Sequence, residues 1–302
     1  MPSLLQITKN TYDAIRRLPQ LPAAYLHPWR RESIRRLAAL KDTHKGQRAF
    51  IIGNGPSLKQ TDLTKLKNEF TFGLNRIYLM FPELGFSTSC LVSINDLVIE
   101  QCAQEMSALE IPKFIAWRSH RHFEPSAVSR QPSASTQSIQ SSNSPILSSS
   151  QSPISSLQFS NFPSSSITNY QLPTFLYTSY TGPRFSRDVR NRVWEGATVT
   201  NVALQLAFHM GFEKIILIGV DHNFISTGEA NKTIVSAGDD PDHFSPAYFG
   251  KGFRWQLPDL DTSEIGYRLA RDAYQKAGRE ILDGTIGGKL TIFPKVDYNS
   301  LF

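Results

Sequence analysis

Asparagine side chains end three apolar segments of this sequence, and amides repeated in this position suggest a binding site. Asn54 closes "FIIGN", Asn75 closes "FTFGLN" and Asn95 closes "LVSIN". An amide offers a donor and an acceptor without charge, which suits a nucleobase, a ribose or a sugar hydroxyl better than a naked triphosphate. Turn chemistry can explain any one of these asparagines, but the three together favour a ligand.

The first of these asparagines belongs to a glycine-rich loop, "GNGPS". The loop lacks the lysine of a triphosphate-binding loop and the glycine spacing of a dinucleotide-binding loop. Gly53 and Gly55 permit a close approach of the backbone. A helix is expected over residues 57–67, after Pro56 and with Ser57 or Thr61 able to cap it, and its amino terminus would favour an anion. We therefore expect a nucleotide with modest phosphate charge.

A histidine in a polar segment supplies a candidate catalytic base. Sugar transfer with inversion needs a base for the acceptor hydroxyl and a group that stabilises charge on the leaving phosphate. His243 lies in "DDPDHFSPAYFGKGFRW", a segment that could close over a ligand. Tyr248, Lys251 and Arg254 of the same segment could donate to phosphate. An ordinary loop role for His243 stays open.

The elements that must position these residues alternate along the chain. Strands are expected at residues 48–53, 70–75, 88–95, 112–117, 214–221 and 289–294, and helices at 57–67, 96–109, 198–212 and 263–284. Short, continuously apolar strands between helices indicate a parallel sheet covered on both faces. The fold class is therefore α/β, a Rossmann-like three-layer sandwich with a mostly parallel sheet and a lid segment. Ligands bind beyond the carboxyl ends of such strands.

Composition changes sharply at residues 124–169, which are dominated by Ser, Pro and Gln. Such a segment cannot bury enough apolar area to offset its ordering entropy, so we expect a disordered insertion. It would interrupt a single domain over residues 48–302, because neither half looks complete alone. A linker between two domains is the alternative.

Residues 1–47 form a basic extension with a predicted helix. Residues 1–48 hold ten Lys/Arg and three Asp/Glu and so carry a net charge of +7, against +6 for the whole chain. The helix either packs on the domain or contacts anionic lipid at the inner membrane face; it carries Arg30, Arg31, Arg35 and Arg36. With no spanning apolar run and no signal peptide, we expect a cytoplasmic protein. Basic and aromatic residues are not interleaved, so no nucleic-acid partner is expected.

Four motifs carry a family resemblance: "IIGNGPSLK", "GLN", "IND" and "ATVTNVALQLAFHMGFEKIILIGVD". They resemble the bacterial sialyltransferases of the Campylobacter type. The broader family includes 6-hydroxymethylpterin diphosphokinase MptE-like proteins and flagellin-modifying glycosyltransferases. The resemblance covers roughly residues 48–122 and 190–260. It implies one Rossmann-like domain, a flexible lid over the site and donor binding without a metal.

The resemblance also implies roles for individual residues. Asn54, Asn75 and Asn95 would hold the CMP part of the donor, and the loop of Gly53, Gly55, Pro56 and Ser57 would surround it. Gly219 and Asp221 would lie beside the cytidine, Thr198 and Thr200 would approach the donor phosphate, and His243 would be the base, with Tyr248 nearby. The sialyltransferases carry a tyrosine pair after the "GVD"-like strand, whereas this chain reads "DHNFISTGEANK".

Three functional hypotheses follow. The main one is a nucleotide-sugar-dependent glycosyltransferase with a CMP-sugar donor and a surface glycan as acceptor, needing no cofactor. The alternative is ATP-dependent pyrophosphoryl transfer of the pterin diphosphokinase type, with Mg²⁺ on acidic residues. Those residues would come from Asp96, Asp221, Asp239, Asp240 and Asp242. The third hypothesis is binding of a nucleotide sugar or glycan without catalysis.

Overall fold

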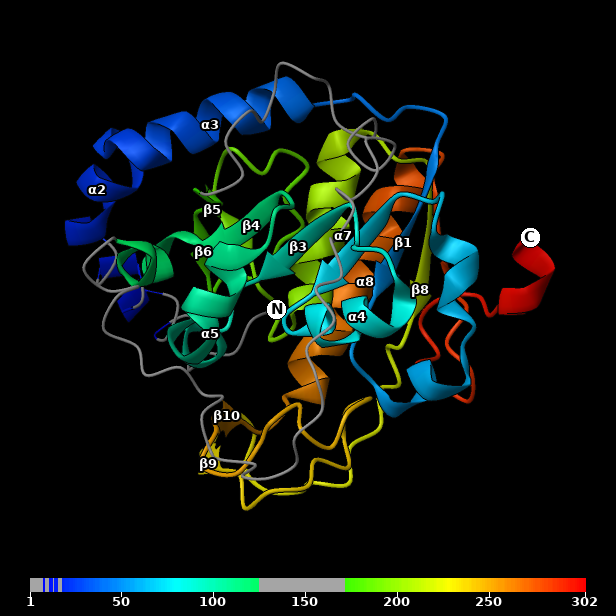
Figure 1. Ribbon diagram of the computed structural model, residues 1–302. Coiled ribbons are helices and arrows are strands. Elements are labelled where there is room, and N and C mark those ends of the chain that lie inside the picture. The colour runs from blue at the N-terminus through cyan, green and yellow to red at the C-terminus, as the bar shows by residue number, and fades with distance from the viewer. Residues whose placement is uncertain (1–7, 9–10, 13, 16–17, 125–171) are drawn as a thin grey trace, which may run out of the picture.

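A seven-stranded parallel sheet forms the centre of the computed structural model, which describes residues 18–124 and 172–302 together with residues 8, 11–12 and 14–15. The strand order is β11-β8-β1-β2-β3-β4-β5 (Figure 1). The strands are β1 (Arg48–Ile52), β2 (Thr71–Leu74), β3 (Cys90–Ser93), β4 (Lys113–Ala116), β5 (Thr174–Leu176), β8 (Lys214–Ile218) and β11 (Glu280–Asp283). The predicted α/β class with a parallel sheet is confirmed. The expected insertion falls outside the described residues except for Glu124.

Helices and short 3₁₀ turns cover the sheet on both faces. The helices are α2 (Leu21–Leu26), α3 (Pro28–Leu40), α4 (Phe81–Leu84), α5 (Asp96–Ala108), α7 (Val199–Met210) and α8 (Leu260–Lys276). The 3₁₀ helices are η1 (Leu18–Gln20), η2 (Pro56–Gln60), η3 (Leu63–Leu66), η4 (Ile77–Met80), η5 (Trp117–Phe123) and η7 (Tyr298–Leu301). Side chains of α7 and α8 share one apolar core with one face of the sheet, and those of α5 share a second core with the other face. Covering both faces explains why every residue of β2, β3 and β4 is buried.

Helix α3 covers the edge strand β5. Ser33 Oγ accepts a hydrogen bond of 2.8 Å from the backbone N–H of Phe175 in that strand, which satisfies a group that an open edge would expose. Arg30 is fully buried and donates to the carbonyl of Arg190. Arg31 and Arg35 are exposed. Within the part of the chain that the structure describes, no helix has both the length and the apolar character needed to cross a membrane.

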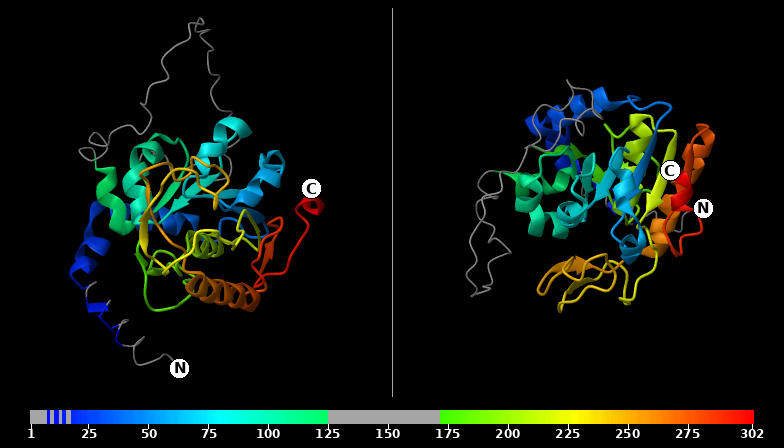
Figure 2. Two further views of the ribbon diagram at one scale, coloured as in Figure 1. Left: turned by 90° about the horizontal axis from the view of Figure 1, so that it is seen from below. Right: turned by 45° about the vertical axis from the view of Figure 1, so that its right-hand side comes forward.

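An antiparallel hairpin of β9 (Thr233–Val235) and β10 (Arg254–Gln256) lies at the opposite end of the molecule from α3 (Figures 1 and 2). Gln101 of α5 fixes it in place, donating to the carbonyl of Arg254 at 2.8 Å and accepting from its N–H at 2.9 Å. Two further two-residue strands, β6 (Thr178–Ser179) and β7 (Val193–Trp194), pair in parallel. The hairpin belongs to residues 222–258, the segment between β8 and α8.

Two predicted elements are wrong, and a third, the helix predicted at 263–284, extends too far at its carboxyl end. The helix predicted at 57–67 is instead η2 and η3, because Asp62 accepts from Thr64 N and begins a new turn. The strand predicted at 289–294 is absent, and β11 pairs with β8 in its place. Helix α8 ends at Lys276, shortly before Gly278 with φ +70°, so residues 280–283 are free to extend.

Candidate functional site

The strand order reverses between β1 and β8, and the loops that follow these two strands lie against each other. In parallel α/β sheets this reversal creates a crevice at the carboxyl ends of the strands. The N–H of Gly53 donates to Ile218 O at 2.8 Å, and the N–H of Gly55 donates to Gly219 O at 2.9 Å. The two loops therefore form one wall of the crevice.

Glycines are required at these positions by the close contact between the two loops. A Cβ on Gly53 would lie 2.2 Å from Gly219 O, and a Cβ on Gly55 would lie 1.8 Å from Asp221 Oδ2. Gly219 itself has φ +64°, a region that suits glycine. The close approach expected between backbone and ligand is thus, in the structure, an approach of one strand-end loop to the other.

Asp221 holds the glycine-rich loop in position. Its Oδ1 accepts from Ser57 N at 3.0 Å and its Oδ2 accepts from Ser57 Oγ at 2.7 Å. Burial raises the pKa of Asp221, while the hydrogen bonds from Ser57 act in the opposite direction. Ser57 is therefore bonded to Asp221 and does not cap a helix, and the segment after Pro56 is 3₁₀, so the predicted α-helix amino terminus at this loop is wrong.

A small cleft of about 170 Å³ opens beside these loops. It brings together most of the residues predicted from the sequence. They are Gly53, Asn54, Gly55, Asn75, Thr198, Thr200, Gly219, Asp221 and His243. Pro56 and Ser57 do not line it. Among the described residues, the lining contains no lysine or arginine.

Two asparagines of the small cleft carry amide groups suited to a ligand. Asn54 is 9% exposed, and its Oδ1 is buried with no hydrogen-bond partner in the described chain. Asn75 has φ +47°, and its Oδ1 accepts from Ser93 Oγ at 3.0 Å. A buried polar atom without a partner is uncommon in folded proteins. A hydrogen-bond donor on a ligand would give Asn54 Oδ1 the partner that it lacks.

The amino terminus of α7 forms another part of this wall. Thr198 is the N-cap, and its Oγ1 accepts from Thr200 N at 3.3 Å. The first turn of a helix leaves backbone N–H groups without helical partners and favours negative charge. Thr198 and Thr200 therefore stand where a phosphate would be stabilised without a cationic side chain.

His243 is fixed by a buried carboxylate. Its Nδ1 lies 2.8 Å from Asp240 Oδ2, and the side chain of Asp240 is 3% exposed. With Nδ1–H donating to Asp240, Nε2 is the nitrogen left to accept a proton. His243 lines both the small cleft and a larger one. Asp240 is one of the predicted metal ligands, and its contact with His243 was not predicted from the sequence.

The ring of Tyr248 packs against one face of the His243 imidazole. The two rings stack with centroids 4.0 Å apart and planes 6° apart. Tyr248 is 1% exposed, and its hydroxyl lies 3.5 Å from Arg76 N. Burial raises the pKa of Tyr248. Of the other two predicted phosphate donors, Arg254 pairs with Glu100 at 3.0 Å and Lys251 is exposed; neither lines a cleft.

The larger cleft has a volume of about 730 Å³ and continues from the small one, within the roughly 300–1,000 Å³ typical of small-molecule sites. The two share residues that include Asn75, Thr198 and His243. Asn95 lines only the larger cleft. Its Oδ1 accepts from Leu97 N at 3.0 Å as the N-cap of α5.

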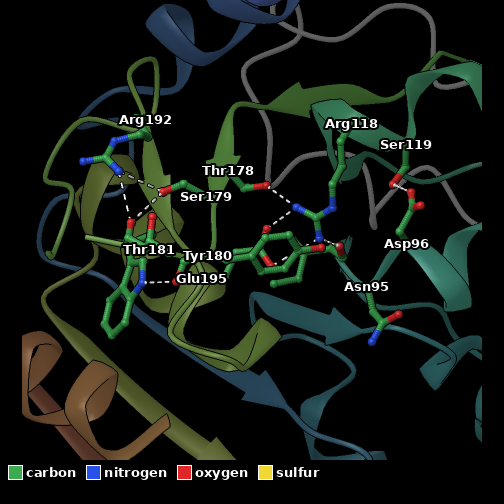
Figure 3. Close-up of polar contacts among 12 residues, drawn as sticks. Asn95, Asp96, Arg118, Ser119, Thr178, Ser179, Tyr180, Thr181, Arg192 and Glu195 are labelled. Atoms are coloured by element: carbon green, nitrogen blue, oxygen red, sulfur yellow. Dashed lines mark hydrogen bonds and ion pairs between the residues drawn. The ribbon is translucent and has the colours of Figure 1, made fainter. Parts of the chain in front are cut away.

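The side chains of the larger cleft that were not found from the sequence include Arg118, Tyr180 and Glu195. Arg118 forms an ion pair with Glu195, and its guanidinium lies 4.5 Å from the centre of the Tyr180 ring (Figure 3). Arg118 and Glu195 lie 77 positions apart, so no local motif could have connected them.

The acidic residues do not form a metal site in the described part of the chain. Asp242 accepts from Ile225 N and Ser226 N, and Asp240 accepts from His243 and from Asp242 N. Asp96 accepts from Ser119 Oγ at 2.6 Å. These three carboxylates therefore each hold other parts of the chain in place.

Comparisons with known proteins give limited similarity. No protein-family model matches the chain, and no curated protein matches it significantly. A solved MAf glycosyltransferase from Magnetospirillum magneticum AMB-1 is similar over 90% of this chain, with 12% sequence identity and a TM-score of 0.48. The aligned part covers 39% of that protein, so this chain spans well under half of its length.

Proposed function

We propose that the protein is a nucleotide-sugar-dependent glycosyltransferase with His243 as its base. One observation carries the proposal: a histidine oriented by a buried carboxylate lies where two clefts join. Transfer needs a donor on one side of the base and an acceptor hydroxyl on the other. The joined clefts offer both places.

The residues suggest how the reaction would proceed. The donor nucleotide lies in the small cleft against Asn54 and Asn75, with its phosphate at the amino terminus of α7. The acceptor oxygen attacks the anomeric carbon, the bond to the phosphate oxygen breaks, and His243 Nε2 takes the acceptor proton. Asp240 then stabilises the imidazolium, and the N–H groups of α7 stabilise the charge on the leaving phosphate.

The charge of the small cleft favours a donor with a single phosphate. The lining holds Asp221, Asp242 and Asp259 and, among the described residues, no lysine or arginine. Each added phosphate charge would meet these carboxylates without a cation in return. A CMP-sugar, with one phosphate charge, is therefore the better-matched donor class.

The first test is the thermal stabilisation of the full chain by CMP, UDP, GDP and ATP, with and without Mg²⁺. A ligand that binds only the folded state raises its apparent stability, and we expect CMP to do so without metal. A shift with ATP that depends on Mg²⁺ would overturn the proposal in favour of pyrophosphoryl transfer.

The second test is turnover of CMP-sugars, followed as CMP release. His243→Ala should lower it by about 10²-fold or more while donor affinity is kept. His120→Ala is the control, because His120 lines neither cleft. Nucleotide affinity with no turnover in the unmodified chain would indicate binding without catalysis.

A further inference from the structure

The ion pair of Arg118 and Glu195, drawn in Figure 3, lines the larger cleft. Arg118 comes from η5, directly after β4, and Glu195 follows β7. Both Nη atoms contact the carboxylate, with Nη2 3.2 Å from Oε2. Arg118 also donates to Thr178 Oγ1 at 2.8 Å and to the carbonyl of Ile94. The guanidinium is thus already bonded on two sides.

The negative charge of Glu195 compensates the positive charge of Arg118, which an acidic ligand would otherwise need as its partner. The side chain of Glu195 is 4% exposed, so its charge is held beside the guanidinium and away from water. Arg118 is the only lysine or arginine that lines this cleft within the described chain. A carboxylate entering the cleft would be desolvated without a free counter-charge, which is costly.

The remaining groups suit the hydroxyls and carbon face of a neutral sugar. Tyr180 is 61% exposed even though one face of its ring lies over the guanidinium. An exposed aromatic ring provides a flat apolar surface for the C–H groups of a pyranose. Amides from Asn95, Asn231 and Gln256 line the same cleft and can exchange hydrogen bonds with hydroxyls.

We propose that the larger cleft binds the acceptor as a neutral pyranose, seated on Tyr180 and the Arg118–Glu195 pair, and discriminates against sugar acids. This proposal rests on the proposed function, which places the acceptor on this side of His243. The small cleft and its nucleotide are not part of it, so the two can be tested separately.

The test is saturation-transfer NMR on the full chain in the presence of CMP. The neutral probes are the methyl glycosides of galactose, glucose and N-acetylglucosamine, and the acidic probes are glucuronic acid and N-acetylneuraminic acid. We expect transfer to at least one neutral glycoside, and a loss of about five-fold or more in Tyr180→Ala. Tyr25→Ala is the control, because Tyr25 is exposed and lines neither cleft. Equal or stronger signals from the acids, or unchanged signals in Tyr180→Ala, would overturn the proposal.

A charge variant tests the discrimination directly. Glu195→Gln frees the charge of Arg118, so binding should move toward glucuronic acid by about ten-fold relative to the neutral glycosides. If this variant has the same melting temperature as the unmodified chain and shows no such change in binding, the charge argument is wrong. If it fails to fold, the Tyr180→Ala result decides whether the proposal stands. Thermal stabilisation by CMP is recorded on every sample. If CMP does not stabilise the unmodified chain, the proposed function is refuted. If CMP stabilises it but the glycoside probes do not bind as expected, only this inference is refuted.

Discussion

At the scale of single residues, the orientation of His243 depends on Asp240. The 2.8 Å contact at Nδ1 leaves Nε2 to act as the base. Asp240→Asn keeps the shape but cannot stabilise the imidazolium, so turnover should fall by about 10²-fold or more with nucleotide affinity unchanged. The measurement is CMP release at saturating donor.

Asp239→Asn is the matched control, because Asp239 is the exposed neighbour of Asp240. Its turnover should equal that of the unmodified chain. Full activity in Asp240→Asn would show that the contact between His243 and Asp240 only holds residues 222–258 in place.

The sequence predicted the polar ends of strands better than their partners. Asn54 and Asn75 line the small cleft because each follows a recognisable apolar strand. The pair of Arg118 and Glu195 escaped prediction because its members lie 77 positions apart and Glu195 follows no predicted strand. Arg118 directly follows the strand predicted at residues 112–117, and this position is the signal that could have marked it. Contacts of this kind depend on how the chain folds back, which no local pattern reports.

At the scale of elements, Asn95 begins helix α5. Its Oδ1 accepts from Leu97 N and Val98 N. Asn95→Ala should lower the free energy of unfolding by about 1 kcal/mol, and Asn95→Asp should retain most of it, since both Asn and Asp are good N-caps. Urea unfolding measures both.

The same pair of variants separates capping from ligand binding. If Asn95 acts as a cap alone, nucleotide affinity stays constant in the stable Asp variant. A fall in nucleotide affinity in Asn95→Asp would support the nucleotide contact that the family resemblance implies for Asn95.

The contact between the loops after β1 and β8 should be intolerant of a single methyl group. Gly53→Ala would place a Cβ 2.2 Å from Gly219 O, a backbone atom that cannot turn aside. We expect a loss of about 2 kcal/mol or more, seen as a lower melting temperature. Gly250→Ala is the control, since its nearest neighbour lies at 3.9 Å; equal melting of the two variants would contradict the argument.

Element boundaries were least predictable where tertiary contacts compete with local ones. The segment after Pro56 has a helical apolar pattern, yet Asp221 bonds to Ser57 and Asp62 begins a second turn. Similarly, the pattern over residues 263–284 looks continuous, but pairing with β8 extends residues 280–283. At Ser57 and at residues 280–283 a partner distant in the sequence determines the local conformation, whereas the second turn depends on the local bond from Thr64 N to Asp62.

At the scale of the whole molecule, Asp188 joins parts that are distant in the chain. It bonds to Arg190 Nε at 2.9 Å and lies 3.6 Å from His209 of α7 and 4.0 Å from Lys41 after α3. The hydrogen bonds from Arg190 lower the pKa of Asp188 to about 2. A lowered carboxyl pKa stabilises the fold above pH 4 and ceases to do so as pH falls toward 2.

Stability should therefore decline over this acidic range, and Asp188→Asn should show a shallower decline. The difference should be on the order of 1 kcal/mol, since the side chain is partly exposed and screened by solvent. Urea midpoints at pH 7, 4 and 3 measure it. Parallel curves for the two proteins would show that Asp188 contributes nothing to acid sensitivity.

Strand order was the part of the architecture beyond the reach of sequence patterns. The apolar runs indicate a parallel sheet, but nothing in "KIILIGVD" states that it pairs beside β1 rather than β5. That choice creates the reversal at which the small cleft lies. The site was therefore predictable as a set of residues and not as a shape.

The chain between Arg118 and Glu195 is fastened at both ends by groups that the structure describes. β4 and β5 pair at Ile115 and Phe175, and the ion pair closes the loop a second time beside the cleft. Because the strand pairing and the ion pair are separate fastenings, a change that breaks only one of them leaves the other to hold this wall of the cleft.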